Sequence, residues 1–147
     1  TILYVTHDQA EATTLADKIG VLKEGHLVQI GTPEEIYENP NSIYVSQRLG
    51  SPKINILPGN LLGMDDVPTF GIRPENITIG NGNHSAKIIS IENLGSETVV
   101  ALNFKDQEIL VSIQGNYKSS INETINFDIN NAKVLKFDQV GNRIYER

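Results

Sequence analysis

The sequence predicts a chain in two parts, an α/β segment over residues 1–52 and an all-β domain over residues 53–147. The first part opens with an unbroken apolar run, and residues that commonly start a helix follow it. After Pro52 the apolar residues mostly alternate with polar ones, and glycine and asparagine residues separate the alternating stretches. Alternation with a period of two is typical of half-buried strands, so we place the boundary at Ser51-Pro52-Lys53.

The apolar run Ile2–Val5 predicts a strand that is buried on both faces, as in a parallel sheet. Thr6 and Asp8 follow, and both are residue types that cap helix N-termini. Apolar residues then recur at helical spacing as far as Ile19, which predicts a helix. Because a natural terminus rarely lies inside a strand, we expect the chain to be a fragment of a longer protein.

A β-hairpin is predicted next, because two apolar runs, Ile19–Leu22 and Leu27–Ile30, surround the polar stretch Lys23-Glu24-Gly25-His26. A tight hairpin turn needs a residue with a positive φ angle, and Gly25 adopts one without steric cost.

Two short helices are expected after the hairpin. The sequence Thr32-Pro33-Glu34-Glu35 combines an N-cap residue, a proline at the first helical position and acidic residues in the first turn. This helix should end before Pro40, because a proline disfavours helical backbone in the residue that precedes it. The second helix is expected over Ile43–Leu49, with Asn41 or Ser42 as its cap.

The second part is predicted to be a small barrel or sandwich, because its strands are short and turn residues separate them. The expected strands are Ile54–Leu62, Thr69–Ile72, Asn76–Ile79, Ala86–Glu92, Thr98–Phe104, Glu108–Ile113, Ile125–Ile129 and Val134–Phe137. Gly80-Asn81-Gly82-Asn83 is expected to be a turn, because no third glycine and no helix follow it as in a dinucleotide-binding loop.

Composition excludes several classes of function. The chain has 147 residues, a formal net charge of -6 and a pI near 5.0. This acidic balance argues against a nucleic-acid partner, because Lys and Arg contacts to phosphate dominate that affinity. The chain has no cysteine, which rules out disulfides and thiolate metal sites and favours the cytosol. Its three histidines lack ligand spacing, so we expect no bound structural metal.

His7 is the one candidate for chemistry. It follows the carboxyl end of a predicted parallel strand, which is where open α/β sheets bind ligands. The N-terminus of the predicted helix beside it favours anions. A neutral imidazole at this position could donate a hydrogen bond to a terminal phosphate oxygen and orient an attacking water.

The segment around His7, Tyr4-Val5-Thr6-His7-Asp8-Gln9-Ala10-Glu11-Ala12, resembles the switch segment, or H-loop, of ABC-transporter ATPases. Gly50-Ser51-Pro52 resembles the junction in maltose-type ATP-binding subunits, and so do Asn55 and Leu57-Pro58. Gly71-Ile72-Arg73-Pro74-Glu75 resembles the signature of their regulatory domain, an OB-like β-barrel called TOBE. Leu94-Gly95-Ser96-Glu97-Thr98 also fits the TOBE pattern.

The resemblance implies that residues 1–52 are the C-terminal remnant of a P-loop NTPase nucleotide-binding domain and residues 53–147 a TOBE domain. It implies that the parent subunit energises an ABC importer for carbohydrate. His7 would contact the γ-phosphate of ATP bound with Mg²⁺, and Gly71, Arg73, Pro74 and Glu75 would mark the regulatory domain. The implied partners are a second copy of the subunit, transmembrane permease subunits, and a cytosolic regulatory protein or metabolite. The parent would lie in the cytoplasm, on the inner face of the membrane through the permease.

Most of the ATPase motifs of that family are absent from the sequence. It has no G-x-x-x-x-G-K-[ST] phosphate loop, no Leu-Ser-Gly-Gly-Gln signature and no apolar strand that ends in an Asp-Glu pair. In the family these motifs precede the switch histidine. We therefore expect the chain alone to be inactive as an ATPase and to bind neither ATP nor Mg²⁺.

Other interpretations of the sequence remain open. A polyamine-type importer shares the switch segment, and a molybdate-type module shares the barrel superfamily. A different class is a free-standing β-barrel that binds small anions or oligonucleotides, although the low aromatic content and the negative charge disfavour nucleic acid. Arg73 and Glu75 could contact an anion or a sugar, but a structural role beside Pro74 is the favoured interpretation.

Overall fold

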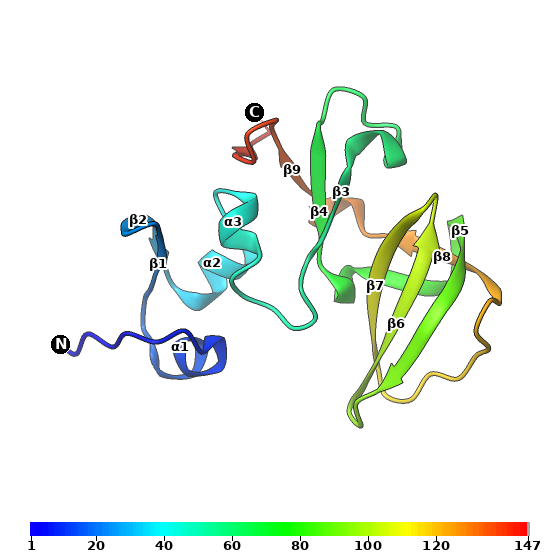
Figure 1. The fold of residues 1–147 in the computed structure, drawn as a ribbon, viewed down its shortest axis with the longest axis horizontal. Coiled ribbons are helices and arrows are strands. Elements are labelled where there is room, and N and C mark those ends of the chain that lie inside the picture. The colour runs from blue at the N-terminus through cyan, green and yellow to red at the C-terminus, as the bar shows by residue number, and fades with distance from the viewer. Residues whose placement is uncertain (147) are drawn as a thin grey trace.

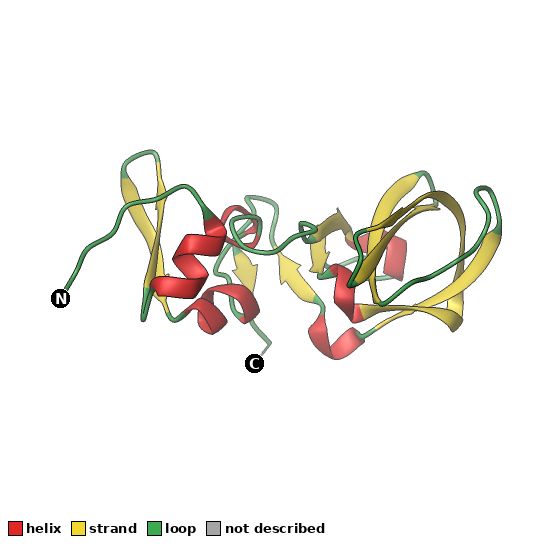
Figure 2. Ribbon diagram, turned by 90° about the horizontal axis from the view of Figure 1, so that it is seen from below, coloured by secondary structure: helices red, strands yellow, loops and turns green. Residues whose placement is uncertain are grey.

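A computed structural model describes residues 1–146 of the chain. Three short α-helices and a two-stranded hairpin lie at the N-terminal end, and two four-stranded sheets follow (Figure 1). In the view of Figure 2 the C-terminal end returns to the side of the helices. No helix within residues 1–146 has the length and apolar character needed to cross a membrane.

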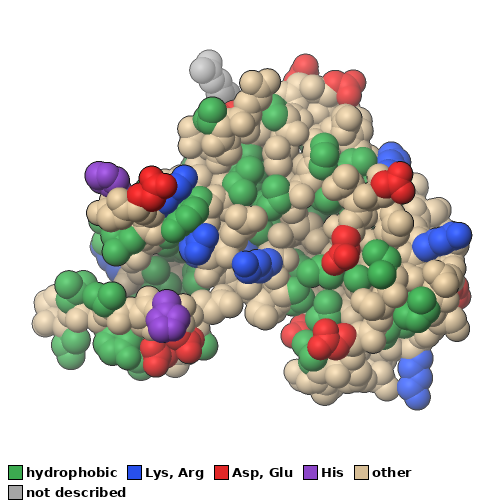
Figure 3. Space-filling model, viewed as in Figure 1, with side chains coloured by type: hydrophobic (Ala, Val, Ile, Leu, Met, Phe, Trp, Pro, Cys, Tyr) green, Lys and Arg blue, Asp and Glu red, His purple; other side chains and the backbone are tan. Residues whose placement is uncertain are grey.

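The first residues do not form the predicted strand. No regular secondary structure is found before Gln9, and the side chains of Ile2, Leu3 and Val5 are 92%, 91% and 83% exposed. Apolar side chains are visible along this arm in Figure 3. The prediction of a doubly buried strand is wrong for this chain by itself, because a strand needs neighbours to pair with and none of the described strands lies beside the arm.

Helix α1, Gln9–Leu15, begins at Asp8 as the sequence predicts. The Asp8 carboxylate accepts hydrogen bonds from the backbone amides of Ala10 and Glu11, at 2.8 and 3.2 Å. The helix ends earlier than predicted, because Ala16 is already extended with φ -94° and ψ 136°. Ile19 therefore belongs to the first strand rather than to the helix.

The predicted hairpin is confirmed as β1, Ile19–Lys23, and β2, His26–Gly31. Glu24 and Gly25 form its turn with φ angles of 50° and 80°. Two successive positive φ angles match the turn type whose twist fits a two-residue hairpin.

Helices α2, Pro33–Glu38, and α3, Ile43–Ser46, follow the hairpin. Thr32 and Glu35 form a reciprocal capping box at the start of α2, and Ser42 caps α3. Helix α3 is three residues shorter than predicted. The helices and the hairpin share a small apolar core, composed of Ile19, Val21, Ile36, Val45 and Leu49.

The rest of the chain is all-β, as predicted, and every strand pair is antiparallel. One sheet has the order β10-β9-β4-β3 and the other β7-β6-β5-β8. The strands are β3 Asn55–Pro58, β4 Thr69–Ile72, β5 Ile77–Asn93, β6 Glu97–Phe104, β7 Gln107–Gln114, β8 Thr124–Ile129, β9 Leu135–Phe137 and β10 Arg143–Ile144. Three short 3-10 helices, η1 Gly59–Leu62, η2 Pro74–Asn76 and η3 Asn131–Lys133, connect some of them.

The two sheets share the largest apolar core. Phe70 and Ile72 of β4 are fully buried in one cluster with side chains from β5 to β8. The remaining buried members of this cluster are Leu57, Ile77, Ala86, Ile88, Val100, Leu102, Phe104, Ile109, Val111, Phe127 and Ile129.

Three of the strand predictions need correction. The strand expected to reach Leu62 ends at Pro58, where η1 begins. The two strands expected around Gly80–Asn83 are one strand, β5, and the expected turn is a bulge in it. Ile79 and His84 both lie opposite Phe127, so the residues between them loop out of the register.

The chain closes on itself near its end. Strand β10 was not predicted, and it pairs with β9. The amide of Ile43 donates to the carbonyl oxygen of Gly141, and the amide of Arg143 donates to that of Asn41, both at 2.9 Å. Residues 141–143 are therefore held against the start of α3.

Candidate functional site

His7 lies at the junction between the extended N-terminal arm and α1, and its side chain is exposed. Within residues 1–146, none of the hydrogen bonds or ion pairs involves its imidazole. Its neighbours are fixed locally, since the Thr6 hydroxyl accepts from the amide of Asp8 at 3.0 Å and donates to the Glu11 carboxylate at 2.7 Å. The imidazole is thus accessible to a group from outside the chain.

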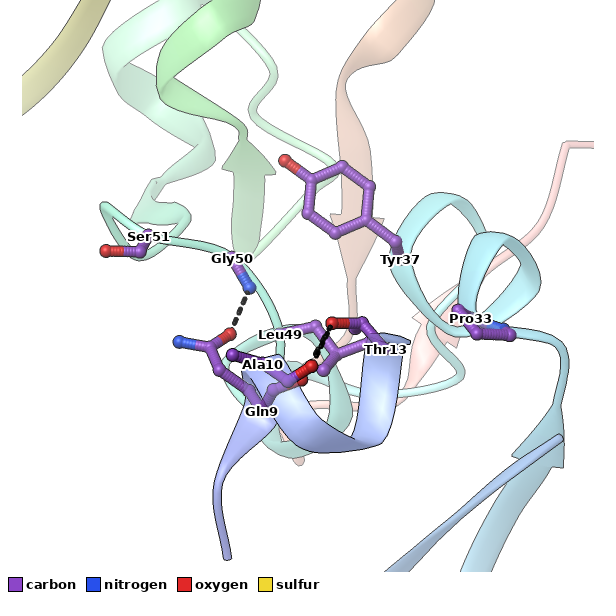
Figure 4. A pocket seen from close by; sticks show the side chains of 8 residues that line it. All are labelled: Gln9, Ala10, Thr13, Pro33, Tyr37, Leu49, Gly50 and Ser51. Carbon is purple, nitrogen blue, oxygen red and sulfur yellow. Dashed lines mark hydrogen bonds between the residues drawn. The ribbon is translucent and has the colours of Figure 1, made fainter. Parts of the chain in front are cut away.

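A cavity of about 400 Å³ opens between α1, α2 and the loop that follows α3. The residues lining it are Gln9, Ala10, Thr13, Pro33, Tyr37, Leu49, Gly50 and Ser51 (Figure 4). One hydrogen bond crosses it, from the amide of Gly50 to Oε1 of Gln9, at 2.8 Å. Gln9 was not among the predicted site residues, because nothing in the sequence indicates a partner 41 positions away.

Arg73 follows β4, and its side chain is only 4% exposed. Its Nη1 donates hydrogen bonds to the carbonyl oxygens of Ser46 and Leu49, at 2.9 and 2.7 Å. Its Nη2 donates to the carbonyl oxygen of Tyr37 at 2.9 Å, and its Cζ lies 3.9 Å from the centroid of the Tyr37 ring. One guanidinium from the β domain therefore satisfies backbone carbonyls at the ends of α2 and α3.

Glu75 is engaged by Tyr37 rather than by Arg73. The Tyr37 hydroxyl donates a hydrogen bond to the Glu75 carboxylate. Burial, together with Glu75, raises the pKa of Tyr37 above its usual value. Burial also lowers the pKa of the Arg73 guanidinium. The two charged residues of the predicted signature thus both contact the helical part of the chain.

Gly71 and Pro74 have structural positions beside Arg73. A Cβ atom on Gly71 would lie 2.9 Å from Cδ1 of Ile54 and 3.1 Å from Cε2 of Phe137, so a larger residue there would have to displace these side chains. Pro74 begins η2 and is buried. The structure brings the four signature residues together, whereas His7 lies in the separate segment that precedes α1.

Asn55 joins the two sheets, and its role was not anticipated. Its Nδ2 donates to the carbonyl oxygens of Ile72 and Leu110, at 3.2 and 2.8 Å. Its Oδ1 accepts from the amide of Leu110 at 2.8 Å. A buried polar residue at the edge of an apolar core indicates such a bridge, although the sequence does not reveal its partner.

A metal centre has no candidate ligands in the part of the chain described here. No group of three or more histidine, cysteine, aspartate or glutamate side chains converges within residues 1–146.

Comparison with known proteins identifies relatives of the chain. Residues 70–134 match the TOBE domain, and this range includes Gly71, Arg73, Pro74 and Glu75. A glycerol-3-phosphate import ATP-binding protein of Rhizobium meliloti is 34% identical over 98% of this chain and 47% of its own length. Residues 70–134 thus match a TOBE domain, and the chain is homologous to ATP-binding subunits of ABC importers.

Two further relatives are similar to almost the whole chain. An α-glucoside transport ATP-binding protein of Rhizobium meliloti is 30% identical over 96% of the chain and 47% of its own length. A sulfoquinovosyl glycerol transport ATP-binding protein of Agrobacterium fabrum is 32% identical over 97% of the chain and 48% of its own length. The chain spans about half the length of the curated relatives that it matches.

Proposed function

We propose that this chain is the C-terminal portion of the ATP-binding subunit that energises an ABC importer for a carbohydrate. The observation that carries the proposal is the similarity over 96–98% of the chain to subunits named for glycerol-3-phosphate, α-glucoside and sulfoquinovosyl glycerol. These three compounds are all polyhydroxylated solutes or their derivatives. They favour a carbohydrate-type substrate over a polyamine.

Residues 1–52 are, in this proposal, the end of the nucleotide-binding domain, and His7 is its switch histidine. The accessible imidazole at the start of α1 supports this role. It would donate a hydrogen bond to the γ-phosphate of ATP and hold the attacking water in place.

This chain alone is expected to bind neither ATP nor Mg²⁺. The sequence has no phosphate loop, and residues 1–146 offer no converging metal ligands. Its contribution to the ATP site is limited to the His7 imidazole. The remaining contacts would come from sequence that this chain does not contain, so the chain alone is expected to be inactive.

Residues 53–147 act as the regulatory and self-association domain in this proposal. The proposed partners are a second copy of the subunit, the permease subunits in the membrane, and a cytosolic regulatory protein or metabolite. The permease would hold the subunit on the inner face of the cell membrane. Nucleic acid is not a proposed partner, because the chain is acidic.

The test begins with the coding sequence upstream of Thr1. A phosphate loop, a signature motif and an Asp-Glu strand in the same reading frame are expected there, and their absence would refute the proposal. In the full-length subunit, His7→Ala should lower kcat for ATP about 100-fold or more and leave the Kd for ATP nearly unchanged.

Two controls accompany this measurement. His26→Ala changes an exposed histidine at the start of β2 and should leave kcat unchanged. The 147-residue chain alone should release no phosphate from Mg-ATP. Hydrolysis at the wild-type rate by the His7→Ala subunit would remove His7 from the mechanism.

A further inference from the structure

A single side-chain hydrogen bond ties the start of α1 to the rest of the protein. Within residues 1–146, the other side-chain hydrogen bonds of this region stay between residues 4 and 13. Only Gln9 reaches further, since its Oε1 accepts from the amide of Gly50 at 2.8 Å (Figure 4). No residue of α1 is fully buried, and the helix rests on the small apolar core through Ala12.

Gly50 also lies close to Arg73 of the β domain and to Tyr37 of α2. A Cβ atom on Gly50 would lie 3.0 Å from Nη1 of Arg73 and 3.3 Å from Cε2 of Tyr37. Arg73 also binds the carbonyl oxygen of Leu49, the residue before Gly50. The loop at Leu49–Gly50 therefore contacts both Gln9 and the Arg73 guanidinium.

The two attachments of this loop differ in strength. The Arg73 guanidinium is buried and donates to three carbonyl oxygens, of which that of Leu49 belongs to this loop, so separating the two takes an acceptor away from a buried charged donor. The bond from Gly50 to Gln9 is one neutral hydrogen bond at the surface, which water replaces readily. A motion that separated these parts would therefore break the bond to Gln9 before the contact between the loop and Arg73.

We propose that Gln9 is a positioning residue through which the β domain sets the place of His7. His7 lies two positions before Gln9, on the segment that leads into α1. With the bond to Gly50 made, α1 and His7 are fixed relative to Arg73. When the bond is broken, α1 shifts and the His7 imidazole moves away from the position in which it would contact the γ-phosphate. This regulation rests on the proposed role of His7, whereas the bond itself does not.

Three variants isolate the bond. Gln9→Met keeps the length of the side chain but removes the acceptor. Gln9→Glu keeps an acceptor oxygen for the Gly50 amide. Thr13→Val is the matched control, since Thr13 lines the same cavity but bonds only the carbonyl oxygens of Gln9 and Ala10 within its own helix.

The first measurement is amide hydrogen exchange at Gly50, followed by NMR in the 147-residue chain. Gln9→Met should accelerate this exchange roughly 3- to 10-fold, which corresponds to the loss of one neutral hydrogen bond. Gln9→Glu and Thr13→Val should leave the rate within a factor of two of wild type, by the same criterion. Equal exchange rates in the wild-type and Gln9→Met chains would overturn the inference.

The second measurement is ATP hydrolysis by the full-length subunit. Gln9→Met should lower kcat roughly 3- to 10-fold without a matching change in KM for ATP. Gln9→Glu should keep kcat close to the wild-type value, because it keeps the acceptor. If His7→Ala lowers kcat and Gln9→Met does not, the coupling is wrong and the proposed function stands. If His7→Ala has no effect, the proposed function fails, and the exchange measurement alone decides whether the bond exists.

Discussion

The guanidinium of Arg73 lies on the ring of Tyr37, with 3.9 Å between its Cζ and the ring centroid, and also donates to the backbone carbonyl of Tyr37 at 2.9 Å. These two residues come from parts of the chain that the sequence patterns separate. Arg73 belongs to the TOBE domain and Tyr37 to α2. The contact thus joins the β domain to the helical segment through one buried side chain.

Replacement of Arg73 by Met should destabilise the chain by about 3 kcal/mol, because three buried or partly buried backbone carbonyls lose their donor. Arg73→Lys should lower the unfolding free energy by less, since the lysine ammonium can donate to some of the three carbonyl oxygens. Urea unfolding followed by far-ultraviolet circular dichroism measures both. Arg48→Met is the control, because Arg48 also lies over a tyrosine ring but is exposed, and its loss should cost under about 1 kcal/mol. Equal effects at the two positions would contradict this role for Arg73.

Gly50→Ala should destabilise the chain more than Gly25→Ala. Both glycines have positive φ angles, 107° and 80°, so each substitution introduces backbone strain of about 1–2 kcal/mol. Only at Gly50 does a Cβ atom also meet Arg73 and Tyr37, whereas at Gly25 nothing lies within 4 Å. The difference between the unfolding free energies of the Gly50→Ala and Gly25→Ala variants therefore measures the cost of the contact of the new Cβ atom with Arg73 and Tyr37. A larger loss for Gly25→Ala would mean that the Gly50 loop relaxes freely.

Asn55→Ala should lower the unfolding free energy by about 2–3 kcal/mol, because it leaves the amide and carbonyl groups of Leu110 without their partner. Asn126→Ala is the matched control, since the Asn126 side chain bonds only the exposed hydroxyl of Ser85. Thermal unfolding of both variants gives the comparison. A near-neutral Asn55→Ala variant would show that the two sheets are held together by the apolar core alone.

Stability should fall as the pH rises above about 10, the ordinary pKa of tyrosine. The folded state raises the pKa of Tyr37, so this hydroxyl binds its proton more tightly in the folded chain than in the unfolded one. Its contribution is complete below the unfolded pKa and is lost as the pH rises toward the folded value. Urea unfolding between pH 8 and pH 11 should show the decline, and Tyr37→Phe should reduce it. The same pH dependence in both proteins would assign the decline to other groups.

Ile2→Ser combined with Val5→Ser should leave the unfolding free energy within about 0.5 kcal/mol of wild type, because both side chains are exposed. The same change should reduce self-association, since it removes apolar side chains from the exposed arm. Sedimentation velocity and hydrogen exchange test these two expectations. Slow exchange across residues 2–5 in a monomer would mean that the arm is paired within its own chain.

The sequence predicts those elements that depend on neighbouring residues. The Thr32–Glu35 capping box, the Gly25 turn and strand Thr69–Ile72 each carry a local signal, and the structure has all three. The prediction of a strand at Ile2–Val5 is wrong because it depends on distant parts of the chain, since an apolar run forms a strand only beside other strands. Strand β10 is too short to give a periodic pattern.

The predicted site was incomplete for a similar reason. His7 and the Gly71–Glu75 signature stand out as short motifs, so the sequence alone indicates them. The acceptors of Arg73 are backbone carbonyls 24 to 36 positions away. Every residue has a backbone carbonyl, so the sequence cannot indicate which ones Arg73 binds. Gln9 is likewise an ordinary residue of a helix N-terminus until the structure places Gly50 beside it.

The pairing of residues 41–43 with residues 141–143 sets an order of events during synthesis on the ribosome. Residues 41–43 emerge about a hundred positions before their partners, so the start of α3 cannot make these contacts until residues 141–143 have also been synthesised. The hairpins of β5, β6 and β7 join neighbours in sequence and can form as they appear. A nascent chain that has not reached Gly141 can therefore contain the folded β7-β6-β5-β8 sheet, while residues 41–43 still lack their hydrogen-bond partners. Stalled translation before Gly141 would release a product that chaperones and proteases recognise.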